Sequence, residues 1–172
     1  MSNDAETPES VRERITDPDQ ELLRPIIRPW VTNGVIAPDA FNISQTDRKH
    51  DFNRMSIARS VATTPEQAYK DRANAIKERC EQNDKIYQAP AGVLAVTVEE
   101  VESVEVKSPQ GSESRHPLTA WDDSMNDNRP DDHGHIDFNE IPPGDKGACL
   151  LAAKALLDRA KKRGWKYGPF AE

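Results

Sequence analysis

One apolar run constrains the fold of this chain more than any other segment. Residues 91–98 read Ala-Gly-Val-Leu-Ala-Val-Thr-Val, and they lie between Pro90 and the acidic pair Glu99 and Glu100. A short apolar run that is rich in β-branched residues and has no polar alternation is typical of a strand buried on both faces. The run therefore predicts a central strand, and the rest of the chain must supply a sheet and the elements that cover it.

Two segments have the periodicity of helices that can cover such a sheet. Thr64 can cap a helix that begins at Pro65, and the apolar positions that follow recur at intervals of three and four residues. This pattern predicts a helix over residues 65–82. A second apolar stripe predicts a helix from about Asp145, its N-cap, to Arg163, with Gly164 in the C-terminal capping position.

Shorter strand-like segments are expected on either side of these helices. Residues 55–58 and 133–138 alternate between apolar and other side chains, and residues 21–30 contain two prolines that favour an extended arm over a helix. The order of strands and helices predicts an α+β fold, in which two main helices cover one side of a small mixed sheet.

Length and charge suggest how the chain is divided. It has 172 residues and a net charge of −7, and residues 1–20 carry six acidic and two basic side chains. We expect residues 1–18 to be a disordered acidic tail and residues 19–172 to be a single α+β domain. A stretch without apolar periodicity, residues 108–132, predicts a long loop, and Trp121 is one of its few large apolar side chains.

Composition also bears on the partners and the compartment of the protein. Lys and Arg are not gathered into a broad basic face, so a nucleic-acid surface is not expected. No run approaches the ~18 apolar residues of a membrane span, and the N-terminus lacks the apolar core of a signal peptide. Two cysteines without a repeated spacing favour a reducing compartment. These features predict a cytoplasmic protein that does not bind membranes.

The clearest candidate site lies on the strand predicted over residues 133–138. Strand alternation places His133, His135 and Asp137 on one face. One histidine could act as a general acid or base that Asp137 orients, the group could bind a metal, or the face could simply be solvated. Arg48, Arg54 and Arg59 are candidates for binding an anionic substrate, since arginine binds phosphate and carboxylate groups through two hydrogen bonds.

A metal at this face needs a further protein ligand. The candidates are His50, His116 or an acid from residues 122–132, and we expect none of them to lie within reach of the two imidazoles. We therefore expect no metal and no cofactor. The chain also lacks phosphate-binding loops, the G-x-S-x-G sequence and C-x-x-C pairs, so no local motif supports nucleophilic or dinucleotide chemistry.

Several short motifs together resemble an uncharacterised family of small bacterial proteins. They are Arg28-Pro29-Trp30 through Ala40-Phe41, the Gly92–Val98 segment, and His133 to Phe138 with the helix that ends in Gly164-Trp165-Lys166-Tyr167. The family pattern is a His-x-x-Ile-Asp-Phe-like strand followed by an Ala/Leu-rich helix ending in Gly-Trp. No activity is assigned to it. Only one histidine precedes Ile-Asp-Phe in that pattern, and His133 and His135 both fit the position.

Two functions follow as expectations. The first is a non-catalytic accessory or interaction protein, whose unknown protein partner binds the loop at residues 108–132, with Trp121 as an anchor. The alternative is an enzyme that acts on a phosphate-bearing or nucleotide-like substrate through a His/Asp acid–base site.

Overall fold

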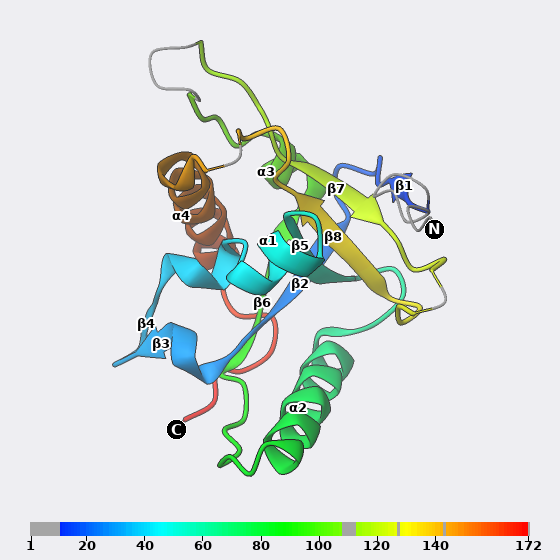
Figure 1. Cartoon of the computed structure of the whole chain (residues 1–172), viewed down its shortest axis with the longest axis vertical. Helices are drawn as coiled ribbons and strands as arrows, with labels where there is room; N and C mark the ends of the chain where they lie inside the picture. The colour runs from blue at the N-terminus through cyan, green and yellow to red at the C-terminus, as the bar shows by residue number, and fades with distance from the viewer. Residues whose placement is uncertain (1–10, 108–112, 127, 143, 172) are drawn as a thin grey trace.

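The computed structural model describes residues 11–107, 113–126, 128–142 and 144–171. These residues form strands, α-helices and short 3-10 helices (η) in a single α+β arrangement (Figure 1). In chain order the elements are β1 (Glu13–Arg14), β2 (Glu21–Ile26), η2 (Arg28–Trp30), β3 (Val31–Thr32), β4 (Val35–Ile36), η3 (Pro38–Phe41), α1 (Gln45–His50), β5 (Arg54–Arg59), α2 (Pro65–Gln82), β6 (Gly92–Thr97), α3 (Val98–Glu102), β7 (Thr119–Asp122), β8 (His133–Asp137) and α4 (Lys146–Arg163).

The main sheet has six strands in the order β1-β7-β8-β5-β2-β6. The α+β class predicted from the sequence is confirmed. The sheet is antiparallel in every described pairing, and the expectation of a mixed sheet was wrong in this respect. Residues 21–26 of the proline-containing arm are extended as predicted and form β2 inside the sheet, between β5 and β6, but residues 28–30 form the 3-10 helix η2.

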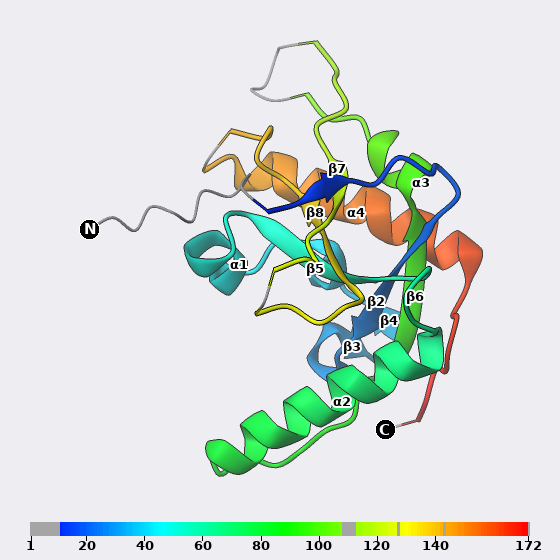
Figure 2. The same ribbon diagram turned by 90° about the vertical axis from the view of Figure 1, so that its right-hand side faces the viewer.

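The two long helices lie on opposite faces of the sheet rather than on one (Figures 1 and 2). Neighbouring residues of β2 show this, because Leu22 belongs to the large core beside α4, whereas Leu23 belongs to a small cluster with Ala68 of α2. Successive side chains of a strand point to opposite faces. Because α2 covers only the β2–β6 end of its face, the β5–β8–β7 part of that face is left for polar side chains.

The apolar run of residues 92–97 is buried throughout, as predicted, but it lies at an edge of the sheet and not at its centre. The C-terminal segment covers this edge. Val93 N donates to the carbonyl of Tyr167, and Phe170 N donates to the carbonyl of Ala91. Gly92 is required there, since a Cβ would come within 2.5 Å of the Tyr167 carbonyl oxygen. Burial therefore comes from the chain end as well as from the neighbouring strand.

Two expectations about loops and tails need correction. Residues 11–18 were placed in a disordered tail, yet Glu13–Arg14 pairs with β7, and Ile15 is buried; residues 1–10 of the expected tail lie outside the described residues. The 108–132 segment was expected to be one long loop, yet residues 119–122 form β7 within the sheet. Residues 108–112 and 127 of this segment lie outside the described residues.

The caps of both long helices are as predicted. The Thr64 side chain accepts a hydrogen bond from Gln67 N at the start of α2, and the Asp145 side chain accepts one from Ala148 N at the start of α4. Gly164 ends α4 with φ 81°. Within the described parts of the chain, none of these helices is long and apolar enough to cross a membrane.

Candidate functional site

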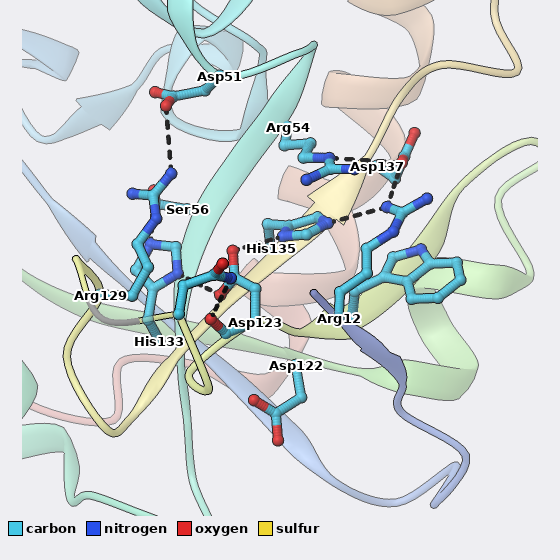
Figure 3. A network of polar contacts seen from close by, with 12 residues as sticks. Arg12, Asp51, Arg54, Ser56, Asp122, Asp123, Arg129, His133, His135 and Asp137 are labelled. Atoms are coloured by element: carbon cyan, nitrogen blue, oxygen red, sulfur yellow. Dashed lines mark hydrogen bonds and ion pairs between the residues drawn. The ribbon is translucent and has the colours of Figure 1, made fainter. Parts of the chain in front are cut away.

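The polar face of β8 carries the three side chains predicted to converge there. The register between β5 and β8 places Ser56 of β5 opposite His135 and Arg54 of β5 opposite Asp137. On the other side, β7 places Trp121 opposite His135. Directly paired residues of an antiparallel sheet share a face. The predicted group of His133, His135 and Asp137 thus lies on one face, between β5 and β7 (Figure 3).

Asp123 is the centre of this group. It follows β7 and lies two residues after Trp121, so its side chain reaches the same face. One carboxylate oxygen accepts a hydrogen bond from His133 Nδ1 at 2.5 Å, and the other accepts one from His135 Nδ1 at 2.9 Å. The expectation that no acid from residues 122–132 would lie within reach of the imidazoles was therefore wrong. A single carboxylate orients both rings, in the role that had been assigned to Asp137.

The surroundings of Asp123 keep it ionised. Its side chain is 5% exposed, and this burial raises its pKa. The hydrogen bonds from His133 and His135, together with the electrostatic attraction of the two rings, outweigh burial, so the pKa of Asp123 lies well below its ordinary value. Both imidazoles therefore present an N–H to a permanent negative charge.

His135 is held as a neutral ring. Its Nε2 lies 3.1 Å from Arg12 Nη1, and because a guanidinium can only donate, Nε2 must accept. Burial lowers the pKa of His135, the hydrogen bond and charge of Asp123 oppose this, and the charges of Arg54 and Arg12 lower it further, with a net decrease. The ring is almost completely buried, so it serves as a fixed support for Asp123.

His133 has a different environment on its second nitrogen. Its Nε2 lies 3.1 Å from the hydroxyl oxygen of Ser56, and its side chain is 13% exposed. A chain of contacts therefore runs from the Ser56 hydroxyl through the imidazole to Asp123. With Nδ1–H directed at the carboxylate, Nε2 of the neutral ring is the acceptor for the hydroxyl proton. This geometry can move a proton away from Ser56.

Asp137 belongs to the group but does not orient a histidine. It accepts a hydrogen bond from Arg12 Nη1 at 2.6 Å, and Arg54 Nε lies 3.9 Å away. The guanidinium of Arg12 also lies over the Trp121 ring, 3.7 Å from its centroid. Through this ion pair, Asp137 binds the segment that precedes β1 to strand β8.

The three arginines expected to bind an anion have different positions. Arg54 lies beside Asp137. Arg59 donates to the carbonyls of His133 and Asp131 and pairs with Asp122, so it holds the ends of β7 and β8 together. Arg48 lies near Cys149 of α4, where burial raises the pKa of the thiol and the charge of Arg48 opposes this.

A fourth arginine, not singled out from the sequence, lies nearer to His133. Arg129 pairs with Asp51 at 3.2 Å, and Figure 3 shows it on the His133 side of the network. The charged residues of the site balance in number once Arg59, which pairs with Asp122, is included. They are the cations Arg12, Arg54, Arg59 and Arg129 and the anions Asp51, Asp122, Asp123 and Asp137.

The site lies on the polar part of one sheet face, where β8 runs between β5 and β7. Two surface hollows of about 340 and 370 Å³ lie elsewhere on the described part of the molecule, one beside α3 and one beside the C-terminal segment, and neither is lined by Ser56 or His133. Within the described residues, no group of three or more His, Cys, Asp or Glu side chains is arranged to hold a metal ion. The contacts of the two imidazoles go to Asp123, Ser56 and Arg12.

Sequence reasoning missed Ser56, Asp123 and Arg12 as members of the site. Ser56 lies in a predicted strand, but its pairing with β8 is not visible in the sequence. Asp123 was one of several acids in an expected loop, and Arg12 was placed in the expected tail. Comparison with known proteins gives no matching family model, no similar curated protein and no similar solved structure. The family resemblance inferred from short motifs therefore stays a prediction.

Proposed function

We propose that this protein is an enzyme in which His133 is the general acid and base and Asp123 is the residue that orients it. The observation that supports the proposal is the contact pattern of His133, with Nδ1 on a buried carboxylate and Nε2 on a hydroxyl at 3.1 Å. A base needs a fixed tautomer, a nearby proton to accept and some access to solvent. His133 has all three.

His135 is the less suitable of the two histidines for proton transfer to a substrate. It is 1% exposed, and its Nε2 already accepts from Arg12. We assign His135 the role of a positioning residue, which fixes Asp123 by a second hydrogen bond. Asp137 has a similar supporting role, since its carboxylate binds the guanidinium of Arg12.

The balance of charges favours an uncharged substrate over the phosphate-bearing class expected from the sequence. Phosphate binding relies on arginine or lysine side chains that are free to donate to the anion. Arg59 is bound to Asp122 and to strand-end carbonyls, and Arg129 is bound to Asp51. The described cations near His133 are thus already paired with acidic side chains.

A hydrolysis screen tests the proposal. Wild-type protein is assayed against chromogenic carboxylic esters, anilides and phosphodiesters, beside the variants His133→Gln and His116→Gln. We expect turnover of at least one class, with a loss of roughly 10²–10⁴-fold in His133→Gln, because a positioned base contributes about this factor. His116 lies outside the network, bonded to the Val104 carbonyl, so its variant should match wild type. Equal turnover in His133→Gln and wild type would refute the assignment.

A second candidate is the non-catalytic interaction protein expected from the sequence. One observation favours it: both nitrogens of each imidazole already have partners within the protein, as in a polar network that only stabilises a fold. Trp121, the residue expected to anchor a partner, is a poor candidate, because it lies in β7 with the Arg12 guanidinium over its ring. Ile86, which follows α2 and is 92% exposed, is a better candidate.

A pull-down separates the interaction protein from the enzyme. Protein carrying Ile86→Ser or Met125→Ser is compared with wild type in lysate of the source cell. Met125 is the matched change, because it is an exposed apolar side chain of the 113–126 segment. Loss of a partner in either variant, with no His133-dependent turnover, would support an interaction protein. Identical partners in all three samples would show that neither Ile86 nor Met125 contributes to partner binding.

A further inference from the structure

We propose that Ser56 is a catalytic nucleophile, and that the reaction is hydrolysis of an uncharged carboxylic ester through an acyl-enzyme. This inference rests on the proposed role of His133 as the base. It adds the residue that forms the covalent intermediate and the chemical class of the substrate.

Three side chains form the relay, and each comes from a different segment. Ser56 lies in β5, His133 in β8 and Asp123 directly after β7. The hydroxyl oxygen of Ser56 lies 3.1 Å from His133 Nε2, and His133 Nδ1 lies 2.5 Å from a carboxylate oxygen of Asp123. A nucleophile within hydrogen-bond reach of a base that a third group orients is the arrangement that activates a serine hydroxyl. It arises here without a local sequence motif.

The backbone fixes the position of the hydroxyl. Ser56 lies in the middle of β5, opposite His135, so pairing with β8 sets the direction of its side chain. On its other side, the Ser56 carbonyl accepts a hydrogen bond of 2.7 Å from Arg24 Nη1. The residue is only partly buried, and α2 packs against β2 and β6 further along this face. Part of Ser56 is therefore exposed to solvent.

The proposed reaction balances with water as the only co-substrate. The Ser56 oxygen attacks the ester carbon while its proton passes to His133 Nε2. The bond from that carbon to the alcohol oxygen then breaks, and His133 returns the proton to the leaving alcohol. Water attacks the acyl-serine in the second half, gives a proton to His133, and the carboxylic acid leaves as the Ser56 oxygen takes that proton back. Asp123 stays ionised throughout and stabilises the imidazolium.

Covalent labelling tests Ser56 directly. The full-length protein is treated with an alkyl fluorophosphonate, and the adduct is located by mass spectrometry of the intact protein and of its peptides. We expect one adduct on Ser56, with labelling at least 100-fold slower in His133→Gln. Ser124→Ala is the matched control, because Ser124 is a neighbouring hydroxyl bonded to Asp122 instead of a histidine. It should be labelled at the wild-type rate.

Each outcome decides between the two proposals. Absence of a Ser56 adduct in folded wild-type protein overturns the nucleophile, whatever the behaviour of the variants. If ester turnover still depends on His133 and survives in Ser56→Ala, His133 activates water instead, and only the nucleophile is refuted. If no adduct forms and no substrate class shows His133-dependent turnover, both proposals fail.

Discussion

At the scale of single residues, Asp123 accounts for most of the geometry of the site. Its two oxygens are each used by a different imidazole, so its position sets the tautomer of both rings. A charge-assisted hydrogen bond contributes about 1.5–3 kcal/mol to stability. Because both bonds share one buried carboxylate, a change at this residue affects both histidines at once.

The variant Asp123→Asn should therefore be strongly destabilised. The amide keeps one acceptor oxygen, but its NH₂ group faces the N–H of the second imidazole, and the negative charge is lost. We expect the free energy of unfolding to fall by about 2–4 kcal/mol, measured by urea denaturation at neutral pH. Asp131→Asn, an exposed acid of the same loop, is the control and should change it by less than about 0.5 kcal/mol. Equal effects of the two changes would contradict the role of Asp123.

His135 should make stability depend on pH. Its pKa in the folded protein is lowered, whereas the unfolded chain binds the proton near the ordinary value of about 6.5. The unfolded state therefore takes up more protons in acid, and stability falls as the pH drops below about 6.5, by up to about 1.4 kcal/mol per pH unit.

Urea denaturation between neutral and mildly acidic pH measures this slope. His135→Asn removes the titrating ring and should flatten the curve. His50→Asn, an exposed histidine at the end of α1, should leave it unchanged. An unaltered slope in His135→Asn would show that the buried ring is not its source.

At the scale of elements, the site depends on close contact between β7 and β8. Gly134 permits this contact, since a Cβ there would lie 2.7 Å from the Trp121 carbonyl oxygen and 2.9 Å from Ile57 Cδ1. The first of these atoms belongs to the backbone and cannot rotate away. Any larger residue must push β7, and with it Asp123, away from the two histidines.

Gly134→Ala should thus cost about 1–3 kcal/mol of unfolding free energy, as overpacking typically does. Gly147→Ala is the matched change, because Gly147 lies in the first turn of α4 and its nearest neighbour would be 3.8 Å away. Alanine there should be neutral or stabilising by up to about 1 kcal/mol. Circular dichroism followed during thermal unfolding compares the two. A Gly134→Ala protein as stable as wild type would contradict the close packing.

The elements also show what the sequence could and could not predict. The helices α2 and α4 and the strand β6 were predicted because capping residues and apolar periodicity are local signals. The short strand β7 was missed because four residues of mixed polarity become a strand only through pairing with β8 and β1. Ser56 and Asp123 were missed for the same reason. Their contacts with His133 depend on strand register, which joins segments far apart in the chain.

At the scale of the whole molecule, ion pairs bind the segment around β1 to the rest of the fold. Arg12 and Arg14 are two residues apart and make ion pairs of different kinds. The Arg12–Asp137 pair has side chains that are 10% and 8% exposed, whereas those of the Arg14–Glu102 pair are 44% and 35% exposed. Loss of one partner from a buried pair leaves an uncompensated charge, but an exposed pair is screened by water.

Arg12→Met should therefore lower the free energy of unfolding by about 3–5 kcal/mol, and Arg14→Met should lower it by less than about 1 kcal/mol. Urea denaturation of both variants makes the comparison. A larger loss in Arg14→Met than in Arg12→Met would contradict the importance of Arg12 for the site.

The tautomers of His133 and His135 test the central claim most directly. In the proposed network both rings carry their proton on Nδ1, facing Asp123, with Nε2 unprotonated towards Ser56 and Arg12. Imidazole nitrogen NMR with isotope-labelled histidine distinguishes these states, and His→Gln variants assign the signals. We predict two Nδ1–H signals protected from exchange, both lost or shifted in Asp123→Asn. Nε2–H tautomers, or signals that Asp123→Asn leaves unchanged, would contradict the account.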